Sequence, residues 1–175
     1  GDKALAAAVA QEIGGGVVDA CGRTTIPELG ALLERMDLLV TGDTGPMHMA
    51  AAVGTPVVGM FFGPALPFDT GPYGEGHVML HAAVECAPCE HAVQCLNPFC
   101  RKEITPDLVA DAALARLAGD WSSLSGLARR AGAVRVYRSE FDDLGLFDCV
   151  PLGGGAASSF EATRRAYRSL WLAAL

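Results

Sequence analysis

The chain has 175 residues, of which 51% are hydrophobic and 19% charged, as expected of one globular domain with a sizeable core. Its formal net charge of −7 argues against a nucleic-acid partner, because nucleic-acid binding needs a basic face. The first residues lack the charged and apolar blocks of a signal peptide, so none is predicted.

The first part of the chain predicts two helices with a short strand between them. The first helix is expected at residues 4–13, the strand at 17–18 and the second helix at 26–35. Thr24 lies in the loop that leads into the second helix.

Residues 38–67 are the most informative stretch. Apolar runs at 38–40 and 57–62 predict two strands, joined by roughly 14 residues that contain a short helix. Pro46 suits the first helical position and Gly54 the left-handed stop. This crossover implies parallel neighbours, and strands without polar alternation are buried on both faces. We therefore expect an α/β fold with a Rossmann-like parallel sheet, whose ligands bind at the carboxyl ends of the strands.

The turn after the first of these strands has the chemistry of an anion-binding site. The N–H groups of Gly45, Met47 and His48 point out of a helix start, where the helix dipole favours negative charge. Thr44 adds a hydroxyl, whereas Asp43 would repel phosphate and suits a helix cap or sugar hydroxyls. The alternative is that Asp43 and Thr44 only cap the helix and that His48 packs. The residues alone favour neither interpretation.

An uncharged stretch at residues 44–68 is long enough to cross a bilayer. Its glycines and prolines would break a spanning helix, and His48 would be stranded in it. A buried crossover explains the stretch without those costs, so we predict no membrane span.

The second half of the chain predicts a strand at 77–81, helices that begin after Thr105 and Asp120, and a strand at 134–138. Thr105 is a suitable cap, and Pro106 suits the first helical position. In a final helix, apolar residues recur at helical spacing opposite a set of arginines. We expect its apolar face to pack on the core, and a basic helix on a membrane surface is the alternative.

Four of the six cysteines lie close together, with the spacing Cys86-x2-Cys89-x5-Cys95-x4-Cys100. Four thiolates so close could hold a structural zinc ion, which is tetrahedral and favours sulfur ligands. Two disulfides fit poorly with a cytoplasmic enzyme, and haem attachment needs a histidine directly after Cys89. A structural zinc ion and a loop of reduced cysteines both stay open.

Several motifs resemble, in order, those of the ADP-heptose:lipopolysaccharide heptosyltransferase family. The family has an Asp-Ser/Thr-Gly-x-x-His turn, a small-residue helix, Gly-x-Pro, an apolar strand and Phe-Gly-Pro. These motifs stand here as Asp43-Thr44-Gly45-Pro46-Met47-His48, Ala50-Ala51-Ala52, Gly54-Thr55-Pro56 and Phe62-Gly63-Pro64. Residues 22–29 and the cysteines resemble further family segments. One departure is Ala65-Leu66, where members usually place a hydroxyl residue.

The resemblance implies a GT-B glycosyltransferase, in which two Rossmann-like domains face each other across a cleft. Residues 1–118 would be the donor-binding domain without its first strand, and residues 119–175 a C-terminal extension. The catalytic base belongs to the opposing N-terminal domain, so we expect no catalytic residue in this chain. The expected donor-binding residues are Asp43, Thr44, Gly45, Pro46, Met47, His48, Thr24, Gly63 and Pro64.

On this resemblance the protein transfers a sugar, heptose from ADP-heptose, to a lipopolysaccharide-type acceptor. It would act in the cytoplasm, with peripheral contact to the inner membrane. No acidic cluster suits Mg²⁺, so we expect that transfer requires no cofactor. The alternative is a non-catalytic module that binds a nucleotide or a sugar phosphate.

Overall fold

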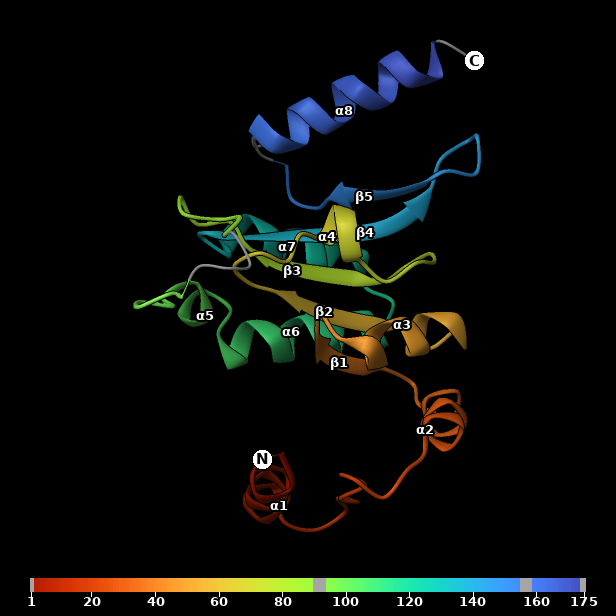
Figure 1. Cartoon of the computed structure of the whole chain (residues 1–175), viewed down its shortest axis with the longest axis vertical. Coiled ribbons are helices and arrows are strands. Elements are labelled where there is room, and N and C mark those ends of the chain that lie inside the picture. Colours follow the sequence, from red (N-terminus) through yellow and green to blue (C-terminus); the bar gives the residue numbers. More distant parts are fainter. Residues whose placement is uncertain (1, 90–93, 155–158, 174–175) are drawn as a thin grey trace.

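The computed structural model describes residues 2–89, 94–154 and 159–173 (Figure 1). Its centre is one five-stranded sheet in the order β1-β2-β3-β4-β5. The strands are β1 (Leu39–Gly42), β2 (Val57–Phe61), β3 (Val78–Ala82), β4 (Val134–Phe141) and β5 (Phe147–Pro151). Strands β1 to β3 pair in parallel, whereas β4 pairs antiparallel with both β3 and β5. The α/β class predicted from the sequence is confirmed.

The path from β3 to β4 explains why the sheet changes direction. Two helices that pack against each other, α6 (Pro106–Leu117) and α7 (Trp121–Arg130), lie between these strands in the chain. One helix would return the chain to the amino end of β3 and allow a parallel strand. The second helix brings it back, so Val134 at the start of β4 pairs with Ala82 at the end of β3. Residues 119–175 thus add β4 and β5 to the same sheet, and its parallel part is confined to β1–β3.

Helix starts follow the capping signals of the sequence. Helix α2 (Ile26–Leu33) begins with a complete capping box between Thr25 and Glu28. Thr105 and Asp120 cap α6 and α7, because their side-chain oxygens accept from the N–H group three residues further on.

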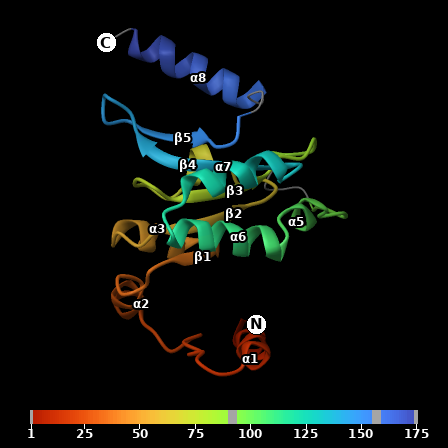
Figure 2. The same cartoon turned by 180° about the vertical axis from the view of Figure 1, so that it is seen from behind.

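Both faces of the sheet are covered, and side chains alternate between two cores. On one face, Val58 and Leu80 pack with α6 and α7 (Figure 2). On the other face, Val57 and Met79 pack with α2 and α3 (Gly45–Ala52). Strands buried on both faces agree with the apolar runs in the sequence, and they hold the loops at their ends in place.

The N-terminal segment lies apart from the sheet (Figure 1). Helix α1 (Asp2–Ile13) has no buried residue. The strand predicted at 17–18 is wrong, and Val18 is 87% exposed. A strand needs partners for its backbone groups, but among the described residues the edge strand β1 pairs only with β2. That the domain lacks its first strand stays a prediction.

The last helix contradicts the prediction that its apolar face packs on the core. Helix α8 (Ser159–Leu172) is the outermost element beyond β5 (Figure 1). The large side chains that it exposes are Tyr167, Leu170 and Trp171. Two of its arginines face the protein instead: Arg164 pairs with Asp148 at 2.7 Å, and Arg168 pairs with Asp142. Ion pairs therefore decide which face of α8 is turned inward.

The uncharged stretch 44–68 forms a crossover within the fold. It contains α3, β2 and the start of α4 (Pro67–Thr70). Among the described residues, no helix combines the length and the apolar character needed to cross a membrane.

Candidate functional site

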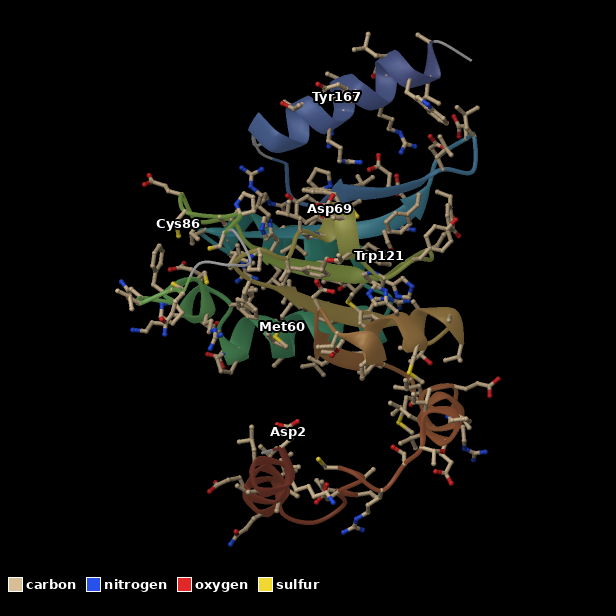
Figure 3. All side chains as sticks on the ribbon, in the orientation of Figure 1. Asp2, Met60, Asp69, Cys86, Trp121 and Tyr167 are labelled. Carbon is tan, nitrogen blue, oxygen red and sulfur yellow. The ribbon has the colours of Figure 1, made fainter. Side chains whose placement is uncertain are left out.

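The carboxyl ends of β1 and β2 bring two loops together. Gly42 at the end of β1 pairs in register with Met60 of β2, so residues 43–48 and the loop after β2 leave the same edge of the sheet. A cavity of about 480 Å³ lies between them. Its lining includes Gly42, Asp43, Thr44, Met60, Phe62, Pro64, Ala65, Leu66, Asp69 and Thr70. Figure 3 labels Met60 and Asp69 of this lining. Asp43, Thr44 and Pro64 of the two expected segments thus line one cavity. The other expected residues of these segments are not among its described lining: Gly45, Pro46, Met47, His48 and Gly63.

Asp43 links the two loops. Its Oδ2 accepts a hydrogen bond of 2.7 Å from the hydroxyl of Thr70, at the end of α4. Its Oδ1 lies 3.9 Å from Nε2 of His48, so the two form an ion pair when the imidazole is protonated. The side chain of Asp43 is 22% exposed and that of His48 is 50% exposed. Both groups are therefore within reach of a ligand.

The interpretation in which Asp43 and Thr44 only cap the helix and His48 packs is wrong. Thr44 occupies the N-cap position of α3 but makes no side-chain cap hydrogen bond. Its hydroxyl lies 3.3 Å from that of Thr41 and 3.4 Å from the Gly42 carbonyl oxygen. Asp43 bonds to the other loop, and His48 is exposed rather than packed. The turn thus presents polar groups that a purely structural helix start does not need.

The helix start offers fewer free N–H groups than the sequence suggests. The N–H of Met47 donates to the Thr44 carbonyl at 3.0 Å, and the Met47 side chain is fully buried. Met47 therefore anchors α3, and a ligand would have to share its N–H. A Cβ built on Gly45 would meet no atom within 4 Å, so a ligand has room to approach this backbone. Pro46 is exposed beside it but has no N–H to donate.

Gly63 and Pro64 belong to the second loop. Gly63 has a φ of 57°, a left-handed conformation that favours glycine. Its carbonyl accepts from the N–H of Cys89 at 3.3 Å, which ties the cysteine-rich segment to this loop. Pro64 lines the cavity directly, together with Ala65 and Leu66, neither of which carries a hydroxyl.

Similarity to known proteins covers both loops of the cavity. Residues 1–99 match Glycosyltransferase family 9 (heptosyltransferase). The chain belongs to this family. It is 32% identical to lipooligosaccharide heptosyltransferase 2 of Campylobacter jejuni over 99 residues, which are 55% of this chain and 31% of the relative. It is 40% identical to lipopolysaccharide core heptosyltransferase OpsX of Haemophilus influenzae over 52 residues, 30% of this chain and 15% of the relative.

These matches confirm the resemblance found in the motifs of the sequence. The chain spans about a third of the length of the Campylobacter heptosyltransferases that it matches, namely 31% and 30%. No solved structure matches the chain.

The hydroxyl groups at the cavity differ from the sequence-based expectation at two threonines. Thr24, expected as a donor contact, is exposed before α2 and is not among the described residues that line the cavity. Thr70, which the sequence did not single out, brings a hydroxyl to the cavity wall. It therefore supplies a hydroxyl to a cavity in which the neighbouring loop residues Ala65 and Leu66 carry none.

A second cavity, of about 430 Å³, lies next to the first, and Leu66 lines both. Its polar lining comes from His81, Arg135, Tyr137 and Thr163. These residues belong to β3, β4 and α8, elements that are far apart in the chain. Since they form no local motif, the sequence alone gave no signal for this cavity.

The four clustered cysteines follow β3 and are free thiols: Cys86 and Cys95 are exposed, and Cys89 and Cys100 are partly buried. Burial and the neighbouring thiols of the other three raise the pKa of Cys89, so the four groups are close enough to interact. In the described part of the chain, however, no three Cys, His, Asp or Glu side chains are arranged to hold a metal ion. The structural zinc ion therefore stays a prediction.

Proposed function

We propose that this chain is the donor-binding part of a glycosyltransferase that transfers heptose from ADP-heptose to a lipopolysaccharide-type acceptor. The family 9 match, which includes both loops of the cavity at the carboxyl ends of β1 and β2, carries the proposal. The relatives are named as lipooligosaccharide or lipopolysaccharide heptosyltransferases, which supports this choice of sugar and acceptor. Such an acceptor would place the protein at the cytoplasmic face of the inner membrane.

The start of α3 is proposed to hold the diphosphate of the donor. Backbone N–H groups and the helix dipole favour an anion at this point. The open space at Gly45 lets a phosphate approach the backbone, and the half-exposed imidazole of His48 can donate to a phosphate oxygen. The same groups would stabilise the negative charge that develops on the departing diphosphate.

Asp43 is proposed to bind the sugar, because a carboxylate repels phosphate. Thr70 holds one of its oxygens at 2.7 Å and so fixes its orientation. Its remaining acceptor sites can receive hydrogen bonds from sugar hydroxyls. The hydroxyl of Thr44, exposed at the same turn, is a second group for this purpose.

Transfer also needs an acceptor and a general base, which we assign to the opposing domain of a complete family member. Positioning two substrates across a cleft supplies much of the rate. These 175 residues should therefore bind the donor without transferring the sugar.

The proposal is tested by titrating the chain with ADP and with ADP-heptose while amide NMR shifts are followed. We expect shifts at Gly45 and His48 and a Kd near 1 mM, about 4 kcal/mol of binding free energy. Sugar transfer by this chain alone would contradict the assignment of the base to another domain. Donor binding without transfer in a protein with both domains would favour a non-catalytic nucleotide- or sugar-phosphate-binding module.

A further inference from the structure

Three basic side chains gather at the amino end of the sheet. They lie away from the cavity at the carboxyl ends of β1 and β2, called the donor cavity below after its proposed function. His77 precedes β3, and Arg138 lies on β4 beside the start of that strand. Arg116 extends from α6, and Trp121 is the first residue of α7. Figure 3 shows Trp121 and Cys86, which follows the carboxyl end of β3, toward opposite ends of the sheet.

Trp121 holds both arginines of this group. The guanidinium carbon of Arg138 lies 4.3 Å from the centre of the Trp121 ring, and that of Arg116 lies 5.5 Å from it. Arg116 is fixed further, because its Nε donates to the carbonyl of Gly76 at 2.6 Å. Cation–π contacts and this hydrogen bond thus place two cations beside one aromatic ring.

No negative group neutralises this pair within residues 2–89, 94–154 and 159–173. None of the ion pairs in that part of the chain involves Arg116 or Arg138. Nε of Arg138 is buried without a hydrogen-bond partner, and so is Nδ1 of His77, a residue that is 4% exposed. Buried polar atoms without partners are rare in folded proteins, and a bound ion is one explanation for them.

In this group, Arg116 and Arg138 repel each other, and the charge of Arg116 disfavours a proton on His77. Burial and the neighbouring Arg138 lower the pKa of Arg116. Burial and the charge of Arg116 lower the pKa of His77 to about 4. An anion beside these groups would offset the repulsion between the arginines and favour their charged forms. Guanidinium groups match the geometry of oxyanions, because their N–H donors form a planar fork.

We propose that Arg116 and Arg138, together with His77, form a binding site for a phosphate group at the amino end of the sheet. Nε and a terminal nitrogen of Arg138, the terminal nitrogens of Arg116 and Nδ1 of His77 would donate to the phosphate oxygens, while Trp121 keeps the arginines in place. A phosphate on a soluble molecule and the phosphate of a lipid headgroup present the same oxygens, so the site fits either source. It is separate from the donor cavity and does not depend on the function proposed above.

Trp121 reports binding directly in a Trp171→Phe protein, since the chain has 2 tryptophans and Trp171 is exposed on α8. Titration with inorganic phosphate, at an ionic strength matched with sodium chloride, should produce a saturable change in fluorescence. Sodium chloride alone should produce none. The absence of a saturable response to phosphate would overturn the proposal.

A pair of matched variants separates a site from a general charge effect. Arg138→Gln should raise the phosphate concentration at half-saturation by about tenfold or more. Arg129→Gln removes the same charge from an exposed position of α7 and should leave this concentration within about twofold. Equal effects of the two variants would overturn the proposal. Circular dichroism checks the fold, and Arg116→Gln provides the same test if Arg138→Gln does not fold.

Two further arms identify the source of the phosphate and its location. Binding to phosphatidylglycerol vesicles that is lost in Arg138→Gln and kept in Arg129→Gln would assign a lipid headgroup. A response to inorganic phosphate without vesicle binding would assign a soluble phosphate. His48→Ala should leave the Trp121 response unchanged, because His48 lies at the other end of the sheet. Loss of the response in that variant would place the anion in the donor cavity and overturn the proposal.

Discussion

Each end of the sheet has a histidine, and the two histidines lie in opposite environments. At the carboxyl end, His48 is 50% exposed beside Asp43, and two loops enclose an open cavity. At the amino end, His77 is 4% exposed, and two arginines lie against Trp121. Parallel strands lead into loops and helix N-termini at their carboxyl ends, and N–H donors gather there. A histidine's place relative to the strands therefore indicates whether it is exposed at a loop, as His48 is, or buried within the fold, as His77 is.

The largest effect is expected from the cysteine-rich segment at the carboxyl end. If the proposed zinc ion is present, metal analysis of protein purified without chelator should give about one zinc per chain. Cys89→Ser should then cost about 4 kcal/mol or more of folding free energy, which lowers the Tm by roughly 10 °C in a domain of this size. Cys21→Ser, outside the cluster, is the control. Protein that contains no metal, and that has the same Tm as Cys89→Ser and as Cys21→Ser, would contradict the zinc ion. The cysteines would then form a loop of reduced thiols.

The second-largest effect is expected from acid, which should lower the stability of the fold through His77 at the amino end of the sheet. In the folded protein, burial and the charge of Arg116 lower the pKa of His77 from 6.5 to about 4. Between these pH values the unfolded chain binds a proton that the folded protein does not bind. Stability is therefore fully present above pH 6.5 and is lost as the pH falls toward 4. The loss approaches roughly 3 kcal/mol.

Urea unfolding near neutral pH and near pH 4.5 measures this effect. His77→Gln removes the titrating group and should lose less stability on acidification than the wild-type protein. His48→Ala removes an exposed histidine and is the matched control. The same pH dependence in His77→Gln and in the wild-type protein would show that the amino end does not hold a neutral histidine.

The contrast between the two histidines is sharpened by binding measurements at the carboxyl end. His48→Ala should weaken ADP binding by about 1.5–3 kcal/mol, the range for a hydrogen bond to a charged group. The free energy of unfolding should change little, because His48 is half exposed. His48→Gln keeps a donor and should retain part of the affinity. Calorimetric titration that finds wild-type ADP affinity in His48→Ala would contradict the proposed role.

The central crossover was predictable because its signals are local. The apolar runs at 38–40 and 57–62 became β1 and β2, and Pro46 lies in the first turn of α3. Asp43 could be placed at the edge of the sheet where the cavity lies, because parallel strands end at one edge. Thr70 could not, because it is 27 residues away in the chain and lies in a helix of 4 residues that is too short for a periodic pattern.

The edge strand β5 and the helix α8 beyond it were mispredicted for a different reason. Helical spacing shows which residues of α8 share a face, but not which face is turned toward the protein. Asp148 and Asp142 decide that by pairing with Arg164 and Arg168, and no local pattern announces such pairs. Strand β5 was missed because Cys149 is its only fully buried residue, so it lacks an apolar run.

The smallest effect is expected from Thr70, whose hydroxyl donates to Asp43 across the donor cavity. Thr70→Val removes the hydroxyl and keeps the shape of the side chain, so it isolates the hydrogen bond. Its loss should cost about 1 kcal/mol of ADP-heptose binding, roughly a fivefold rise in Kd. ADP alone should bind as before, because Asp43 is proposed to hold the sugar. Thr70→Ser should restore the affinity for ADP-heptose. Equal weakening of both ligands would instead show that the bond between the two loops shapes the phosphate-binding turn itself.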